Sequence, residues 1–378
     1  MRNVVVAGYA RSPFHLAGKG ALARVRPDDL AAQVIRGLIQ QTGVKAEDIE
    51  DIVLGCAFPE GEQGFNIARL IGLLADLPLS VGGMTVNRFC GSSMSSVHIA
   101  AGQIQLGAGE AFICAGVESM SRVPMMGFNP LPNPELAKKS AAYMGMGDTA
   151  ENVATKYQIT RAQQEAFAVA SQDKAAAAIA AGKLEAEIVP ITTKAGVVDK
   201  DGTPRAGTTT ETLAGLKPAF SQDGTVTAGT SSPLTDGASA ILVTSEDYAR
   251  AHGLPILARI KSVAVSGCQP EIMGIGPVEA SRKALQRAGL SVDQLDVVEL
   301  NEAFASQSLA CISDLGLDQS KVNLDGGAIA IGHPLGATGA RIVGKAAALL
   351  KREGGSYALA TQCIGGGQGI ATVLEAAE

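Results

Sequence analysis

Short apolar runs alternate with amphipathic segments over the first third of the chain. Val4–Ala7, Asp51–Cys56 and Ala111–Gly116 are runs of strand length with few polar residues, so each predicts a buried strand. A fourth strand is expected to end near Val86. These runs provide the strands of a sheet with little exposed surface.

The segments between these runs carry apolar residues at helical spacing. Arg26–Gln41 and Gly64–Ala75 predict helices, and we expect Asp28 or Asp29 to cap the first of them. A third helix is expected from about Ser93 to Leu106. Strands that alternate with helices predict a parallel sheet covered on both faces, and hence an α/β protein.

The alternation is lost from about Glu118 to Leu234. Thr160–Ala181 is a long alanine-rich segment that predicts an amphipathic helix, and Gly196–Gly207 is polar and rich in turn residues. Methionines cluster in the first part, at Met120, Met125, Met126, Met144 and Met146. They suit either an adaptable apolar ligand surface or an irregular core. We expect this region to be an insertion that covers the sheet.

The strand and helix alternation returns from about Ala238 and repeats the first half. Three pairs of segments agree in order: Asp28–Ala57 with Pro277–Ala303, VNRFCGSS at Val86 with VNLDGGAI at Val322, and the strand ending at Cys114–Gly116 with Leu359–Cys363. This pattern predicts a duplicated α/β unit. Turns after equivalent strands then meet near a pseudo-twofold axis. Cys90 from one half could therefore share a pocket with Asn301, His333 and Cys363 from the other.

The repeat and the insertion together predict the division of the 378 residues. An N-terminal half is expected to comprise residues 1–119 and 235–256. A loop domain at 120–234 covers the site, and a C-terminal half occupies 257–378. A chain of this length is expected to form more than one core.

Charge and cysteine content narrow the function classes. The net charge of −6 argues against a nucleic-acid-binding surface, although a basic pocket for one phosphorylated ligand stays possible. The six cysteines are scattered without a C-x-x-C pair or zinc-like spacing, which predicts a reduced, cytoplasmic protein. A strand that begins at the N-terminus leaves no room for a signal peptide, and we expect no membrane span.

The segment Val86–Ser96 (VNRFCGSSMSS) is the strongest candidate for chemistry. Cys90 is expected in a tight turn between a strand and a helix start, where unpaired N–H groups and the helix dipole favour the thiolate. A thiolate is the form that attacks carbonyl carbon. Free cysteines are also often small buried apolar residues, so this position alone does not decide the matter.

Five segments in order resemble the thiolase family, and the resemblance covers essentially the whole chain. They are Val86–Ser96, Val226–Ala240 (VTAGTSSPLTDGASA), Asn301–Ala305 (NEAFA), Gly326–Arg341 (GGAIAIGHPLGATGAR) and Cys363–Gly369 (CIGGGQG). The resemblance implies a thiolase-like fold: a duplicated five-layer α-β-α-β-α core with an inserted loop domain. It also implies an acyltransferase that acts through a covalent acyl-cysteine.

The resemblance implies five catalytic positions. Cys90 resembles the nucleophile that carries the acyl group, and His333 resembles the base that activates it. Cys363 resembles the acid/base that moves a proton at the α-carbon. The N–H groups of Cys90 and Gly365 would form one oxyanion hole, and Asn301 would hold a water that forms a second with His333.

Coenzyme A enters as a substrate through the same resemblance. Ser232 and Phe304 match contacts to its pantetheine arm, Met146 is expected beside them, and Arg205 matches a residue near the nucleotide end. Arg205 could equally be an ordinary solvated charge. We expect no tightly bound cofactor and no metal site, because no metal, flavin or nicotinamide motif occurs.

Gly145 favours one subclass over another. Short-chain biosynthetic thiolases usually carry a histidine where this chain has Gly145, so the resemblance is closer to degradative 3-ketoacyl-CoA thiolases of fatty-acid β-oxidation. The alternatives are a short-chain acetoacetyl-CoA thiolase, a condensing enzyme, and a non-catalytic protein that binds acyl-CoA or lipid. A homodimer or homotetramer is expected, with the methionine-rich insertion and the strand near Thr85 as candidate interfaces. Preferred chain length, direction, pathway and a multienzyme β-oxidation partner stay open.

Overall fold

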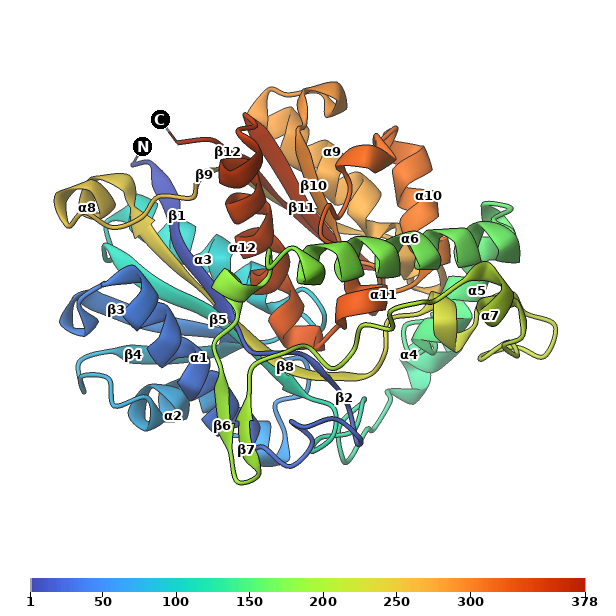
Figure 1. Ribbon diagram of the computed structural model, residues 1–378, viewed down its shortest axis with the longest axis horizontal. Helices are drawn as coiled ribbons and strands as arrows, with labels where there is room; N and C mark the ends of the chain where they lie inside the picture. The colour runs from blue at the N-terminus through green and yellow to red at the C-terminus, as the bar shows by residue number, and fades with distance from the viewer. Residues whose placement is uncertain (1, 378) are drawn as a thin grey trace.

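One mixed sheet of ten strands runs through the whole molecule (Figure 1). The computed structural model describes residues 2–377, so the two terminal residues lie outside it. The strand order is β10-β11-β12-β9-β1-β8-β5-β3-β4, with β2 paired to β8. The strands of this sheet are β1 (Val4–Arg11), β2 (His15–Leu16), β3 (Ile49–Gly55), β4 (Gly82–Val86), β5 (Ala111–Ser119), β8 (Thr235–Ser245), β9 (Ala258–Gly267), β10 (Val297–Leu300), β11 (Tyr357–Ile364) and β12 (Gln368–Glu375). The remaining strands, β6 (Ile191–Thr193) and β7 (Gly196–Val198), form a separate hairpin.

Helices surround and divide this sheet (Figure 1). They are α1 (Pro27–Thr42), α2 (Ile67–Leu74), α3 (Ser92–Leu106), α4 (Pro134–Lys139), α5 (Met146–Lys156), α6 (Arg161–Ala180), α7 (Thr210–Ala214), α8 (Glu246–Ala251), α9 (Gly276–Ala288), α10 (Ala305–Leu315), α11 (Ala328–Ile331) and α12 (Leu335–Glu353). Within residues 2–377, no helix combines the length and the hydropathy that a membrane span requires.

The prediction of a wholly parallel sheet is wrong. β3 pairs in parallel with β4 and β5, and β10 with β11, but the strands between these groups pair antiparallel. The β11–β12 connection spans only residues 365–367, and so short a turn can join only antiparallel strands. The insertion separates β5 from β8, and it returns the chain in the opposite direction along the sheet.

The duplication is confirmed element by element. α1 ends at Gly43, with φ of 73°, and a single 3₁₀ turn then leads into β3. α9 ends at Gly289, with φ of 69°, and a similar turn leads into β10. A left-handed residue at each helix end favours glycine. The two halves therefore use the same helix, turn and strand to begin their parallel pairs.

The predicted five layers are present, because the two halves of the described sheet join only through the short β1–β9 pairing and pack on either side of α3 and α12. α3 and α12 pack together in the middle, where their buried residues form one apolar cluster with strands of both halves. A second cluster packs α1 and α2 against the outer face of the N-terminal strands, and a third packs α9 and α10 against the C-terminal strands. Figure 1 shows α12 crossing the centre of the molecule. The crossing of the central helices is close, because a Cβ at Gly339 would lie 2.2 Å from the Met94 nitrogen.

The start of α1 differs from its prediction. Arg26 is the N-cap and makes no side-chain cap hydrogen bond, and the helix begins at Pro27, before either of the aspartates expected to cap it. Asp28 and Asp29 instead lie in the first turn, where their charges still favour the helix dipole. The predicted helix at Thr160–Ala181 is observed as α6, and Thr160 caps it in a capping box with Gln163.

The insertion contains α4 to α7 and the β6–β7 hairpin. Its longest helix, α6, contacts α10 and α11 of the C-terminal half and α7 of the insertion itself (Figure 1). The proposed division at residues 119, 234 and 256 stays a prediction. What the structure establishes is that this region lies over the end of the sheet where the candidate residues gather, because insertion residues line cavities that also contain Cys90.

Candidate active site

Cys90 lies in the turn between β4 and α3, as predicted. The turn is held by backbone hydrogen bonds from Gly91 to Arg88 (2.9 Å) and from Ser92 to Phe89 (3.1 Å). Phe89 has φ of 45°, a left-handed conformation that costs a residue with a Cβ free energy. This strained residue immediately precedes the candidate nucleophile. Because a strained conformation persists only when the surrounding contacts hold it, the turn fixes the position of Cys90.

The C-terminal half contributes the remaining catalytic candidates. Asn301 follows β10, His333 lies between α11 and α12, and Cys363 lies in β11 just before Gly365. Cys90, His333 and Cys363 line one cavity of about 710 Å³. The Gln362 amide also donates a hydrogen bond to the Cys90 carbonyl, which ties β11 to the nucleophile turn. The structure therefore brings the predicted residues of both halves together.

His333 is held by three contacts, two through its ring and one through its backbone. Its Nδ1 lies 2.6 Å from the Thr338 hydroxyl, its Nε2 lies 3.5 Å from Asn301 Nδ2, and its backbone N–H donates to the Thr235 hydroxyl. If Asn301 Nδ2 donates to Nε2, then Nδ1 carries the proton and Nε2 accepts. Thr338 has no predicted role, although its place five residues after His333 in the same glycine-rich segment is a usable signal.

The protonation states of Cys90 and His333 follow from burial. Burial raises the pKa of the Cys90 thiol to about 11, against the lowering effect of a backbone hydrogen bond from Gly365. Burial, and then the positive charge of Arg341, lower the pKa of His333 to about 3. At neutral pH the cavity therefore contains a thiol and a neutral imidazole, and a neutral imidazole has a ring nitrogen free to accept a proton.

The expected thiolate at the helix start is therefore wrong. The helix begins at Ser92, so Cys90 is one residue before the N-cap and receives little of the dipole. Desolvation by the surrounding protein outweighs the backbone hydrogen bonds and favours the neutral form. Cys363 behaves alike: burial and the nearby Cys90 hold the pKa of its thiol well above the usual value. Both cysteines keep their protons until the reaction moves them.

The four predicted coenzyme A contacts line this same cavity: Met146, Arg205, Ser232 and Phe304. The Ser232 backbone N–H donates to the Ala303 carbonyl (2.9 Å), which places the serine turn against the segment that carries Phe304. Phe220 packs edge-on against Phe304 with ring centroids 5.9 Å apart, and sequence analysis missed it. Arg205 is exposed at the cavity wall, where its charge can meet a phosphate.

Methionine lines much of this cavity. Six of the nine methionines of the chain contribute to it: Met120, Met125, Met126, Met144, Met146 and Met273. The unbranched, polarisable thioether adapts to ligands of different shape. Of the two interpretations of the methionine cluster, the structure favours the ligand surface.

A second cavity of about 480 Å³ also reaches Cys90. It shares Met125, Met126 and Met146 with the first cavity, and its own walls include Phe58, Phe89 and Leu131. The Phe58 and Phe89 rings lie 5.9 Å apart. This apolar chamber could not be predicted from the sequence, because its walls come from separate segments at 57–60, 87–90, 125–146, 335 and 365–366. Cys90 therefore lies where two cavities meet.

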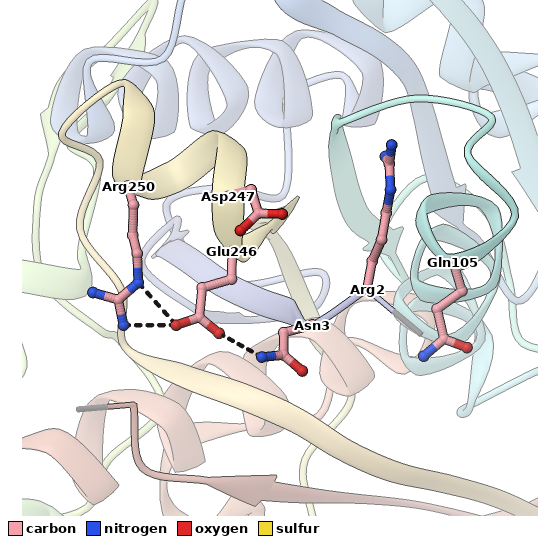
Figure 2. Close-up of a pocket in the computed structure, with 6 residues that line it drawn as sticks. All are labelled: Arg2, Asn3, Gln105, Glu246, Asp247 and Arg250. Atoms are coloured by element: carbon pink, nitrogen blue, oxygen red, sulfur yellow. Dashed lines mark hydrogen bonds and ion pairs between the residues drawn. The ribbon is translucent and has the colours of Figure 1, made fainter.

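A further hollow lies beside α8 and contains none of the predicted residues (Figure 2). One of its two carboxylates, Glu246, accepts hydrogen bonds from Asn3 (3.0 Å) and from Arg250 (2.6 and 2.9 Å). The walls are polar and contain neither a thiol nor an imidazole. Over the described part of the chain, no group of three or more His, Cys, Asp or Glu side chains is placed to hold a metal ion.

Comparisons with known proteins agree with this geometry. The family model "Thiolase, N-terminal domain" matches residues 4–247, and "Thiolase, C-terminal domain" matches 254–376. The chain is 47% identical to a Bacillus subtilis 3-ketoacyl-CoA thiolase and 49% identical to one from Aliivibrio fischeri, with 99% of this chain and 100% of each relative covered.

Solved structures carry both subclass names. A human mitochondrial 3-ketoacyl-CoA thiolase in complex with CoA matches with a TM-score of 0.92 and 38% identity, over 100% of this chain and 98% of the other. A Bacillus anthracis acetyl-CoA acetyltransferase matches with a TM-score of 0.92 and 40% identity, over 100% and 99%. The backbone therefore does not separate the subclasses, and the cavity walls must do so.

Proposed function

The chain belongs to the thiolase family, and from this premise we propose that it cleaves 3-ketoacyl-CoA esters with coenzyme A. The products are acetyl-CoA and a shortened acyl-CoA, and the reverse reaction is a Claisen condensation. The observation that carries the proposal is the position of Cys90 at the junction of two cavities. The cavity that contains Arg205 and Ser232 suits the pantetheine arm of coenzyme A, and the other cavity, which is also largely apolar, suits an acyl chain.

The first half-reaction begins at Cys90. His333 Nε2 takes the thiol proton while Cys90 Sγ attacks the 3-keto carbon, and the N–H groups of Cys90 and Gly365 stabilise the oxyanion. The bond between C2 and C3 then breaks, which leaves the acyl group on Cys90 and an acetyl-CoA enolate. Cys363 donates its proton to C2, and acetyl-CoA leaves. The protonated imidazole and the Cys363 thiolate balance the charges.

The second half-reaction restores the enzyme. Cys363 takes the proton of an incoming CoA thiol, and the CoA sulfur attacks the Cys90 thioester. When the tetrahedral intermediate collapses, Cys90 leaves as a thiolate and recovers its proton from His333. Two neutral thiols and one neutral imidazole at rest are the protonation states that these two half-reactions require.

Asn301 is proposed to act on the enolate. Its Nδ2 lies 3.5 Å from His333 Nε2, and its buried Oδ1 has no hydrogen-bond partner within the described chain. A buried polar atom without a partner favours a bound water. A water held there beside His333 would donate a hydrogen bond to the enolate oxygen.

The proposal includes the degradative subclass. Gly145 lines the cavity of about 710 Å³, which we call the coenzyme A cavity. Gly145 has no side chain, which leaves room beside Met146. The second, apolar cavity offers space that an acetoacetyl group does not need. A short-chain acetoacetyl-CoA thiolase is the alternative, and the similarity to the acetyl-CoA acetyltransferase supports it. We infer a place in fatty-acid β-oxidation, with or without a multienzyme partner.

We also propose a homodimer, with a homotetramer as the larger alternative, in the cytoplasm. The edge strand β4 is half-buried along its whole length, and the exposed Phe65 and Leu79 flank it. An exposed edge with apolar neighbours is a surface that pairing can cover. The free state of all six cysteines supports a reducing compartment.

The test is the intact mass of the protein after brief exposure to 3-ketooctanoyl-CoA without free CoA. We expect a six-carbon acyl adduct on Cys90, located by peptide mapping, and none in a Cys90→Ala variant. Acetylation by acetoacetyl-CoA without the longer adduct would move the protein to the short-chain subclass. Failure of both esters to label Cys90 in the folded protein would refute the enzyme proposal.

A further inference from the structure

A buried ion pair at the centre of the molecule is only partly satisfied. Arg341 on α12 is 1% exposed and Glu299 on β10 is fully buried, and Arg341 Nη1 lies 3.3 Å from Glu299 Oε2. Glu299 Oε1, Arg341 Nε and Arg341 Nη2 have no hydrogen-bond partner within the described chain. Such a pair stabilises a fold less than apolar residues of the same shape.

The next turn of the same helix shows what a satisfied pair looks like. Lys345 Nζ lies 2.8 Å from Glu187 and 2.7 Å from Asp325, and Asp325 is also bonded by Arg352. This second cluster meets its charge and hydrogen-bond requirements within the protein. The contrast indicates that Arg341 and Glu299 are not explained by stability alone.

The position of the pair connects it to the site. Glu299 lies two residues before Asn301, at the end of the short strand β10. Arg341 lies in the second turn of α12, which begins at Leu335, directly after His333 and Pro334. The pair therefore fastens the segment that carries Asn301 to the helix that follows His333. Those two side chains form the 3.5 Å contact on which the proposed enolate site depends.

We propose that Arg341 and Glu299 are positioning residues that hold His333 and Asn301 in register for enolate stabilisation. This inference rests on the proposed function, because it assigns the pair to one step of that reaction. The charge of Arg341 also reaches His333, where it helps burial to keep the imidazole neutral. A small displacement of either segment would move the water held by Asn301 away from His333, and both must donate to the same enolate oxygen. Preorganised donors lose their effect when they are misplaced.

The test is a double-mutant cycle on thiolysis. Glu299→Gln keeps the shape and removes the charge, and it is measured alone and in an Asn301→Ala background. We expect Glu299→Gln alone to lower kcat about 10- to 100-fold with KM within about twofold. In the Asn301→Ala background it should lower kcat by less than about threefold, because the contact that it positions is already lost.

Asp325→Asn is the matched control. It neutralises a buried carboxylate that pairs with the next turn of α12, but it does not touch β10 through that pair. Its effect on kcat should be equal in both backgrounds. Arg341→Lys keeps the charge and shortens the fork, and it should retain part of the coupling. Circular dichroism melts show whether each variant folds. If Glu299→Gln fails to fold, Arg341→Lys takes its place in the cycle.

Equal losses from Glu299→Gln in both backgrounds would overturn the inference, as would a loss below threefold in the otherwise unchanged protein. The failure of the proposed function is a separate result: the unmodified protein would then show no thiolysis. In that case the iodoacetamide labelling rate of Cys90 replaces kcat in the same cycle. Coupling between positions 299 and 301 would still support the pair, and its absence would refute it.

Discussion

At the scale of single residues, the site is built from groups that are neutral at rest. Cys90, Cys363 and His333 each have their neutral form favoured by burial, and each is placed by a strained turn, a strand or a short hydrogen bond. The reaction therefore starts without a stored thiolate. A resting thiol is also less open to oxidation than a thiolate would be.

This state predicts the pH dependence of Cys90 alkylation. Because burial raises the pKa of Cys90 to about 11, the thiolate fraction rises with pH across the working range. We expect the iodoacetamide labelling rate to increase roughly tenfold per pH unit between pH 7 and pH 10. Peptide mapping separates Cys90 from Cys268, which is also partly exposed. A plateau below pH 8 would instead show a stabilised thiolate, as the helix-start argument predicts.

Residue identities in the site could be predicted, but their electrostatics could not. The segments around Cys90 and His333 are long and occur in the same order as in the thiolase family, so the candidate residues could be identified from this resemblance. The pKa of Cys90 depends on how much protein surrounds the sulfur, and that surrounding protein comes from distant segments. Thr338 and Phe220 were missed for the same reason, since each acts through a neighbour fixed only by the fold.

At the scale of elements, β4 has two roles in the structure. It leads into the nucleophile turn, and it is the outer strand of the sheet. Asn66 bonds to Gly83 and Thr85, so the segment with Phe65 is fastened to β4. A dimer that covers this edge would therefore also hold the strand that delivers Cys90.

We expect Phe65→Asp combined with Leu79→Asp to weaken the dimer by about 100-fold or more, because charges would face an apolar interface. Phe65 is 92% exposed in the single chain, so the monomer should still fold. Sedimentation velocity measures the change. Val197→Asp, on the β6–β7 hairpin and 64% exposed, is the control and should leave the mass unchanged. An unmodified chain that sediments as a monomer would contradict the dimer.

Element order was predictable, but strand direction was not. Apolar periodicity gives the positions of α1, α6 and β5 to within a few residues, and the repeat identifies equivalent elements. The antiparallel pairing of β8 with β5 depends on the path of a long insertion. The antiparallel pairing of β12 with β11 depends on a three-residue turn. The alternation of strands and helices indicates neither the path of the insertion nor the length of the turn. The prediction of a parallel sheet therefore holds only for the β3–β4–β5 and β10–β11 groups.

At the scale of the whole molecule, the two halves and the insertion together form the two chambers. The apolar chamber predicts a chain-length test. Ala142 lines only that cavity, and Ala142→Trp should fill part of it. We expect kcat/KM for 3-ketooctanoyl-CoA to fall about 100-fold while acetoacetyl-CoA changes by less than about threefold.

Ala219→Trp is the control for that test. Ala219 lines only the coenzyme A cavity, so its replacement should impair both substrates alike. Steady-state rates over the two chain lengths measure the effect. Equal losses for both substrates in Ala142→Trp would show that the acyl chain lies elsewhere.

The junction at Cys90 also has a kinetic consequence. A single cavity of about 710 Å³ must receive the CoA part of the substrate and later the free CoA, so the first product departs before the second substrate arrives. Double-reciprocal plots at several CoA concentrations should then be parallel, the signature of a ping-pong mechanism. A compound that joins a pantetheine arm and an alkyl tail at one electrophilic carbon would fill both chambers together. The shortened acyl-CoA product also spans both chambers, whereas acetyl-CoA leaves the second chamber empty, so such a compound is expected to inhibit as an analogue of the longer product.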